Sequence, residues 1–112
     1  MERARRLRKG AEFDTAYREG TVVGGPLLVV RARRNGAEVT RWGFAVGKRI
    51  APLATRRSRT KRVLREAVRT LNVEPGWDVI VTLRAGALAG RGGAMRDEVA
   101  RALRKCGVGV ES

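Results

Sequence analysis

The chain of 112 residues contains no histidine and a single cysteine, Cys106. Without histidine there is no Cys/His zinc site and no Ser-His or Cys-His nucleophilic pair, and one cysteine forms no internal disulfide. A Walker loop is missing, because Gly43 to Lys48 has the wrong spacing and no Ser or Thr follows the lysine. No apolar run approaches the ~18 residues of a membrane span, and the N-terminus lacks the apolar region of a secretory signal. We therefore expect a cytoplasmic protein that has no membrane partner, with Cys106 as a small buried apolar residue.

Acidic residues are also scarce. Eleven Asp and Glu stand against 25 Lys and Arg, which gives a formal net charge of +14 and a pI near 11.7. This balance is typical of a nucleic-acid binder. Most of the bases are arginine, whose forked donors fit phosphates, although genomic base composition also enriches arginine. The length and the 43% hydrophobic content suit one domain with one core.

The main amphipathic segment runs from Arg56 to Leu71. At about 100° per residue its apolar side chains share one stripe of a helix. The stripe consists of Val63, Leu64, Ala67, Val68 and Leu71. The opposite face carries Lys61, Arg62, Arg65 and Arg69, and the segment holds seven bases and one acid. Such a face is often only a solvated surface, but like charges one turn apart repel, so we expect an anionic partner here.

A short helix is predicted over residues 11–19, with Gly20 as its end. Phe13 and Tyr17 share one face of this helix by their i, i+4 spacing. Such a pair is usually core, and a platform for stacking nucleic-acid bases is the alternative. The preceding residues, 1–10, form a basic arm that is too charged and too short to hold a core.

Alternation predicts strands over residues 22–33 and 39–48, joined as a hairpin by Asn35-Gly36. On the second strand Trp42, Phe44 and Val46 alternate with Gly43, Ala45 and Gly47. The small residues either form a groove for an extended single strand or admit a packed helix; both readings stay open.

The run Asp78 to Arg84 is apolar enough for a strand buried on both faces. Because a helix separates it from the preceding strand, we expect a parallel βαβ pairing. Residues 85–93 are a glycine-rich loop, and a last helix follows with Gly107 as its stop. Its apolar stripe consists of Met95, Val99, Ala102, Leu103 and Cys106, and Asp97 and Glu98 are expected near its first turn.

The run from Arg41 to Glu66 resembles the signature of the bacterial ribonuclease P protein component. In that family a strand of the form Arg-x-Gly-Phe-x-Val-x-Lys-Lys precedes Arg-Asn-Arg-x-Lys-Arg and a downstream Arg-Glu, and the spacing here matches without a gap. The resemblance extends over nearly the whole chain, through Arg-Leu-Arg-Lys at 6–9, Phe13, Tyr17, Gly20 and the strand Trp77-Asp78-Val-Ile-Val.

Five positions depart from the family pattern. Ser58 replaces the central asparagine and loses the amide's paired donor and acceptor. Arg49 replaces the second lysine, and Ala51-Pro52 replaces a Gly-Asn pair that often follows. Arg31 stands where some members carry an aromatic residue, and its guanidinium plane can still stack.

The resemblance implies an α+β domain, an α/β sandwich with a mixed sheet of about four strands in the order αβββαβα. Its βαβ crossover would have the unusual left hand. Residues 1–10 would be a flexible arm and residues 11–108 the single RNA-binding domain.

Members of this family bind a large catalytic RNA, and the complex removes the 5′ leader of precursor tRNA. The resemblance implies Mg²⁺ ions, held mainly by the RNA, as the cofactor of this hydrolysis. It implies an endoribonuclease subunit without catalytic groups or metal ligands of its own, partnered by ribonuclease P RNA and precursor tRNA and by no obligate protein.

Two sets of site residues follow from the resemblance. Contacts to phosphates of the catalytic RNA are expected from Lys48, Arg49, Arg57, Ser58, Arg59, Lys61, Arg62 and Arg65. A cleft for the single-stranded leader is expected from Phe13, Tyr17, Val29, Arg31, Ala45 and Gly47.

Two other classes share parts of this pattern. A ribosomal or other structural RNA-binding protein would carry the same charge and basic helix, but would have no reason to keep the strand-loop-helix spacing. A DNA-binding module would need a helix-turn-helix before the basic helix, which the sequence lacks. Preference for RNA over duplex DNA at matched salt separates these classes.

Overall fold

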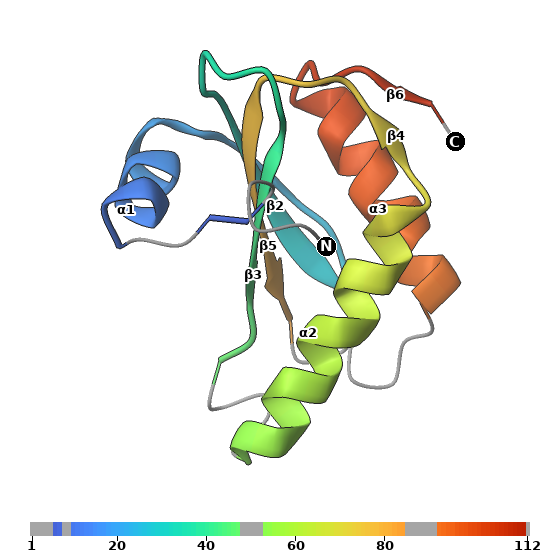
Figure 1. Cartoon of the computed structure of the whole chain (residues 1–112). Helices are drawn as coiled ribbons and strands as arrows, with labels where there is room; N and C mark the ends of the chain where they lie inside the picture. Colours follow the sequence, from blue (N-terminus) through green and yellow to red (C-terminus); the bar gives the residue numbers. More distant parts are fainter. Residues whose placement is uncertain (1–5, 8–9, 48–52, 85–91, 112) are drawn as a thin grey trace.

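A four-stranded sheet with helices on both faces forms the body of the molecule (Figure 1). The computed structural model describes residues 6–7, 10–47, 53–84 and 92–111. The helices are α1 (Gly10–Glu19), α2 (Ala54–Arg69) and α3 (Gly92–Lys105). The main sheet contains β1 (Thr21–Gly24), β2 (Leu28–Arg34), β3 (Arg41–Ala45) and β5 (Trp77–Leu83). A second, two-stranded sheet, which the sequence did not predict, pairs β4 (Asn72–Val73) with β6 (Val110–Glu111).

The strand order in the main sheet is β1-β2-β5-β3. Strand β5 pairs antiparallel with β2 and parallel with β3, so the sheet is mixed. The predicted α+β class, the four-stranded mixed sheet and the parallel β3-α2-β5 connection are therefore confirmed. The left hand of the crossover stays a prediction from the family resemblance.

The hairpin predicted around Asn35-Gly36 is wrong. A turn does form there, with Gly36 at φ +69° and the Asn35 Oδ1 accepting the N–H of Ala37 at 2.7 Å. The strands on either side of it are not partners, because β5 lies between β2 and β3. Strand β5 is buried along almost its whole length, and an apolar run with two buried faces belongs in the interior of a sheet.

The strand-like stretch 22–33 is also two strands rather than one. Strands β1 and β2 form an antiparallel hairpin that turns at residues 25–27, where the N–H of Gly25 donates to the carbonyl of Leu28 at 2.9 Å. The buried carboxylate of Glu98 accepts the N–H groups of Leu27 and Leu28 at 3.0 and 2.8 Å. Helix α3 begins at Gly92, so Glu98 lies beyond the first turn where the sequence placed it and holds this hairpin turn instead.

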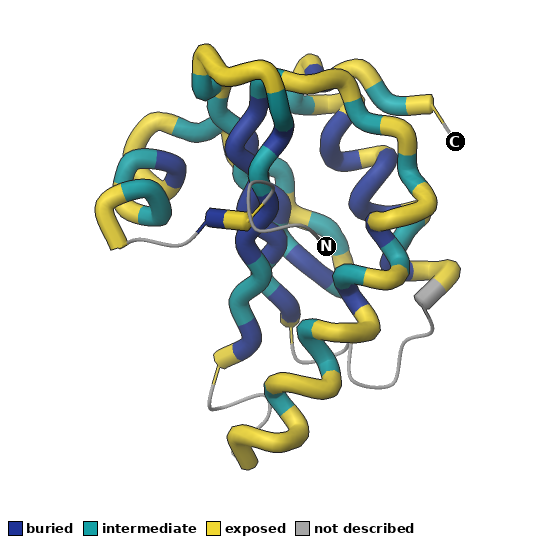
Figure 2. Tube along the Cα trace, viewed as in Figure 1, coloured by how far each residue is buried: buried dark blue, intermediate teal, exposed yellow. Residues whose placement is uncertain are grey.

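Helices α2 and α3 cover one face of the sheet and form the main core with it (Figure 2). Leu64 and Val68 of the predicted α2 stripe are buried, whereas Val63 is 41% exposed. The α3 stripe is buried at Met95, Val99, Ala102 and Leu103. Cys106 is half-buried rather than buried as expected, and this burial raises the pKa of its thiol.

Helix α1 and residue Leu7 cover part of the opposite face. Leu7, Ala16 and Ile80 are buried there, with Phe13 packed against them. The N–H of Leu7 donates to the carbonyl of Trp42 at 2.9 Å, so this part of the predicted arm is attached to β3. Residues 1–5 and 8–9 of the arm lie outside the described residues, and the division into an arm and a domain stays a prediction.

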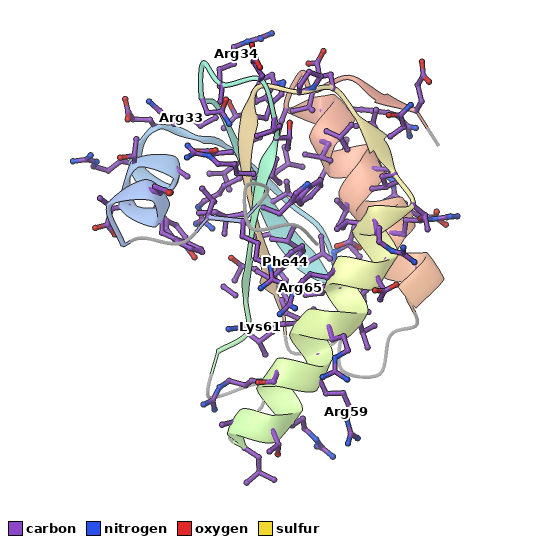
Figure 3. The ribbon with its side chains drawn as sticks, in the orientation of Figure 1. Arg33, Arg34, Phe44, Arg59, Lys61 and Arg65 are labelled. Carbon is purple, nitrogen blue, oxygen red and sulfur yellow. The ribbon has the colours of Figure 1, made fainter. Side chains whose placement is uncertain are left out.

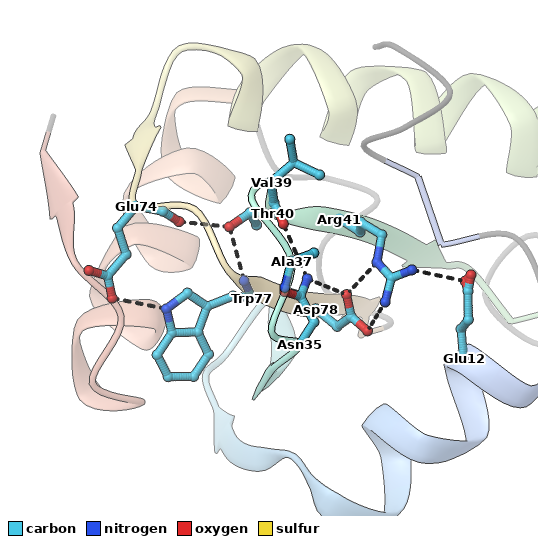
Figure 4. A network of polar contacts seen from close by, with 9 residues as sticks. All are labelled: Glu12, Asn35, Ala37, Val39, Thr40, Arg41, Glu74, Trp77 and Asp78. Carbon is cyan, nitrogen blue, oxygen red and sulfur yellow. Dashed lines mark hydrogen bonds and ion pairs between the residues drawn. The ribbon is translucent and has the colours of Figure 1, made fainter.

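A polar network joins α1 to the end of the sheet where β3 and β5 begin (Figure 4). The guanidinium of Arg41 donates to both carboxylate oxygens of the buried Asp78, at 2.8 and 2.9 Å, and the Asn35 amide donates to the same carboxylate at 2.9 Å. Arg41 also lies 3.6 Å from Glu12 of α1. Hydrogen bonding to Asp78, opposed by burial, raises the pKa of Arg41, which therefore stays charged.

At the same end of the molecule, Glu74 supports Trp77. Its carboxylate accepts a hydrogen bond from the backbone of Gly109 and one from the Trp77 indole at 2.9 Å, and these lower the pKa of Glu74 below its ordinary value of 4.5. A carboxyl group whose pKa is lower in the folded state stabilises that state above its unfolded pKa, and the contribution disappears as the pH falls through the folded pKa. We therefore expect the stability difference between wild type and Glu74→Gln to shrink as the pH falls below about 4.5. Urea denaturation at several pH values measures this, and a constant difference would contradict it.

Candidate nucleic-acid interface

The six predicted RNA-contact residues on α2 form two rows along the helix. Arg57, Lys61 and Arg65 repeat every four residues and are half-buried, and Lys61 and Arg65 lie beside β3. Ser58, Arg59 and Arg62 form the other row and are exposed. Figure 3 shows Arg59, Lys61 and Arg65 along this helix. The single acid of α2, Glu66, pairs with Arg69 at 3.1 Å, and among the described residues no carboxylate forms an ion pair with Lys61, Arg62 or Arg65.

The N-terminus of α2 is rich in bases. Its N-cap residue, Leu53, makes no capping hydrogen bond through its side chain, and the first turn contains no acid. A helix N-terminus favours anions, and bases there are unfavourable unless an anion is present. A cavity of about 400 Å³ opens beside it, lined by Ala54, Thr55, Ser58, Arg59 and Arg62. This end of the helix is therefore suited to phosphate; Lys48 and Arg49, predicted to act with it, lie outside the described residues.

The predicted cleft residues lie on or beside the sheet face that α1 partly covers. Strand register places Gly24, Val29, Thr82 and Ala45 in one row across this face. The next row contains Val22, Arg31, Ile80 and Gly43. The structure thus brings Val29 and Ala45 together on either side of Thr82, with Arg31 in the neighbouring row.

The small residues at and after β3 were predicted either to admit a packed helix or to form a groove, and the structure separates these two possibilities by position. Gly43 is buried, and a Cβ built on it would lie 2.6 Å from the ring of Phe13, so this glycine admits a packed side chain of α1. Gly47 is exposed, and a Cβ there would meet nothing within 4 Å. Packing against α1 therefore uses the first position, and the second, just beyond the end of β3, lies in open space, where a groove stays a prediction.

The two aromatic residues of α1 also differ in their surroundings. Phe13 is half-buried against the sheet, whereas Tyr17 is 41% exposed. The guanidinium of Arg31 lies 4.6 Å from the centre of the Tyr17 ring. The two side chains thus form one cation–π unit beside the predicted cleft. Phe13 packs against the sheet, and its place in the wall of that cleft stays a prediction.

Sequence reasoning missed Thr82. Its Oγ1 is buried, lies between Val29 and Ala45 in the register, and has no hydrogen-bond partner among the described residues. Alternation along β5 places Thr82 on the same face as Ile80, but the continuous apolar run concealed this. A cavity of about 460 Å³ lies away from the predicted cleft, between β3, β4 and the end of α2.

The close contact at Gly43 leads to a stability prediction. Alanine at this position would displace Phe13, and overpacking of this kind costs roughly 1–3 kcal/mol. We expect Gly43→Ala near the lower limit, because the Phe13 ring is only half-buried and can tilt. Gly47→Ala is the control and should change the free energy of unfolding little. Equal effects of the two variants in urea denaturation would contradict the packing role of Gly43.

The described residues offer cations rather than metal ligands. No group of three His, Cys, Asp or Glu side chains among them is placed to hold a metal ion. None of the described helices is long and apolar enough to cross a membrane.

Comparison with known proteins relates this arrangement to one family. The family model described as Ribonuclease P matches residues 1–107, a range that includes every predicted site residue. A ribonuclease P protein component of Gluconacetobacter diazotrophicus is 39% identical over 111 residues, covering 96% of this chain and 95% of that protein. The corresponding protein of Dehalococcoides mccartyi (strain CBDB1) is 38% identical over 87 residues, covering 78% of this chain and 72% of its own length.

Solved structures are also similar to most of this chain. A Staphylococcus aureus RNase P protein, a mutant with defective mRNA degradation activity, superimposes with a TM-score of 0.83 at 26% identity, covering 97% of this chain and 93% of its own. The RNase P protein of Thermotoga maritima gives a TM-score of 0.75 at 28% identity, covering 86% of this chain and 92% of its own.

Proposed function

This chain belongs to the ribonuclease P protein family, and from this premise we propose that it binds the catalytic RNA through α2 and the 5′ leader of precursor tRNA through the sheet face beside α1. The family places the chain in a tRNA-processing endoribonuclease complex with an RNA partner. The finer assignment, which surface binds which RNA, follows from the family resemblance, and the geometry of this chain supports it.

The observation that carries the proposal is the large excess of bases over acids on α2. The helix contains a single acid, Glu66, and that acid pairs with Arg69. Each phosphate bound by these bases releases condensed counterions, which makes binding favourable at low salt. The predicted contacts that the structure describes, from Arg57 to Arg65, all lie on this one helix.

The second surface suits a single strand. Val29, Thr82 and Ala45 form a half-buried row with little side-chain bulk, and Phe13 and the Tyr17–Arg31 pair stand beside it. Unpaired bases stack on aromatic and guanidinium planes with little sequence preference. This fits a leader, whose sequence differs among precursor tRNAs.

The part of the chain that the structure describes is not suited to hold the Mg²⁺ of the reaction. Its interface is cationic, and its described residues contain no cluster of carboxylates placed for a metal. We therefore assign the metal and the chemistry of phosphodiester hydrolysis to the RNA. The role left for the protein is to neutralise phosphates, so that the RNA folds and binds its substrate at lower Mg²⁺.

The test is cleavage of a leader-bearing precursor tRNA by a bacterial ribonuclease P RNA at low Mg²⁺, with and without this protein. Restored cleavage would support the proposal. Tight binding to the RNA without restored cleavage at any Mg²⁺ concentration would mean that the chain is a structural RNA-binding protein, and the proposal would fail.

Phe13→Ala tests the cleft separately. Loss of a base-stacking side chain costs roughly 1–3 kcal/mol per base, so we expect precursor tRNA to bind the reconstituted complex about fivefold or more weakly. Mature tRNA, which has no leader, should bind as before. An unchanged preference for precursor over mature tRNA would show that the cleft assignment is wrong.

A further inference from the structure

A small pocket of about 190 Å³ lies at the outer edge of β3, between α1 and α2. Strand β3 is the last in the sheet order, so no strand of the main sheet lies beyond it. Phe13 and Phe44 supply aromatic surface to the pocket, and Arg6, Lys61 and Arg65 supply positive charge. Figure 3 shows Phe44, Arg65 and Lys61 next to one another where β3 faces α2.

The backbone holds Arg6 at this pocket. Arg6 forms a parallel bridge with Trp42, and the adjacent Leu7 is 6% exposed and donates its N–H to the Trp42 carbonyl at 2.9 Å. A residue near the N-terminus is thereby fixed beside two bases that lie more than fifty positions later in the chain. The sequence alone gave no sign of this meeting.

Within the part of the chain that the structure describes, the three cations are not paired with acids. Among the described residues no carboxylate forms an ion pair with Arg6, Lys61 or Arg65; the nearby acid of α1, Glu12, is paired with Arg41 instead. Burial, with repulsion from Arg6 and Arg62, lowers the pKa of Arg65. Like charges gathered at a concave site are relieved by an anion that all of them contact.

The aromatic wall indicates what accompanies that anion. The rings of Phe44 and Trp42 are parallel, 3° apart in plane and 6.1 Å between centres, which fixes the orientation of Phe44. A carboxylate or an isolated phosphate would use only the cations. A nucleotide combines a phosphate with a flat base that packs against an aromatic ring.

We propose that this pocket binds one unpaired nucleotide of RNA, with its phosphate on Arg6, Lys61 and Arg65 and its base against Phe13 and Phe44. The inference rests on the proposed function and adds to it two residues, Arg6 and Phe44, and a position on the β3 edge apart from the row of Val29 and Ala45. The nucleotide belongs either to the catalytic RNA or to the substrate, and its chemistry is the same in both cases.

The first experiment compares Arg6→Glu with Arg104→Glu. Both change the net charge equally, and Arg104 is an exposed base on α3. One arm measures binding of each protein to ribonuclease P RNA over a series of salt concentrations. The other arm measures binding of precursor and mature tRNA to the reconstituted complex. Arg6 is itself exposed, so Arg6→Glu should fold as the wild type does.

We expect Arg6→Glu to weaken binding about tenfold in one of the two arms and to reduce the salt slope there by about 0.7 for each lost phosphate contact. Loss in the first arm assigns the nucleotide to the catalytic RNA, and loss in the second, with precursor tRNA, assigns it to the substrate. If Arg6→Glu behaves like Arg104→Glu in both arms while the wild type supports cleavage, the pocket proposal is overturned and the proposed function stands. If the wild type does not support cleavage, the proposed function is wrong, and the pocket proposal, which rests on it, fails with it.

Phe44→Leu tests the proposed contact between the nucleotide base and Phe44. Leucine keeps an apolar side chain beside Trp42 but removes the flat ring, so we expect binding in the same arm to weaken about fivefold. The salt slope should stay unchanged, because no phosphate contact is lost. Thermal denaturation checks that the variant is folded. Wild-type affinity in a folded Phe44→Leu variant would overturn the base contact.

Discussion

Alanine at both Arg57 and Arg59 is expected to raise the Mg²⁺ concentration that the reconstituted complex needs for half-maximal cleavage of precursor tRNA. The two side chains stand in different rows near the N-terminus of α2, whose first turn contains no acid. If each binds one phosphate of the catalytic RNA, their loss lowers the salt slope of binding by about 1.4 to 1.8 and weakens binding by roughly tenfold to a hundredfold. Added Mg²⁺ can replace the missing cations, so activity should return when the metal is raised.

The matched control is the double variant Arg101→Ala with Arg104→Ala, which removes the same charge from exposed positions of α3. Its Mg²⁺ dependence should follow the wild type, because α3 is not part of the proposed interface. A shift as large as that of Arg57→Ala with Arg59→Ala would mean that overall charge, and not the position of α2, determines the effect. Cleavage that stays low at every Mg²⁺ concentration would point instead to a direct part in the reaction.

Arg41→Met is expected to lower the free energy of unfolding by about 3 kcal/mol, because it leaves the buried carboxylate of Asp78 without its cation. Asp78 has 1% of its surface exposed and would retain, of the side-chain contacts described above, only the hydrogen bond from Asn35. Removal of one partner of a buried pair is far more costly than removal of a pair at the surface. Urea denaturation gives the value.

The same substitution should loosen α1. Glu12 Oε2 is buried and has no hydrogen bond among the described residues, and its contact with the network is the 3.6 Å ion pair to Arg41. We expect amide exchange in α1 to quicken more than exchange in α3. Arg33→Ala, which removes a partly exposed pair with Glu19, is the control and should cost less than about 1 kcal/mol. If Arg41→Met lowers the free energy of unfolding no more than this control does, the proposed contribution of the buried pair to stability is contradicted.

The sequence predicted the elements whose signals are local. The stripe that ends at Leu71 predicted α2 to within two residues at each end, and Gly20 and Gly107 correctly placed the ends of α1 and α3. The apolar run after Asp78 predicted the buried strand β5. The spacing from Arg41 to Glu66 predicted the family, because a long motif at fixed distances is specific.

The predictions that failed or stayed open concern residues far apart in the chain. Asn35-Gly36 has the local chemistry of a hairpin turn and does turn, but β5 separates the strands on either side because its two apolar faces both need cover. The same distance explains why Thr82, placed between Val29 and Ala45, was missed.

The charge, the amphipathic helices and the family motif were thus determined by the sequence itself, since each depends on neighbours within a few turns of chain. The tertiary structure decided which strands pair, that Gly43 makes room for Phe13, and that Arg6 meets Arg65 at the edge of β3. These depend on which long-range pairing buries the most apolar surface while leaving buried charges partnered, as Asp78 is by Arg41. A periodic pattern specifies which face of an element is apolar, and only the assembled sheet specifies what that face meets.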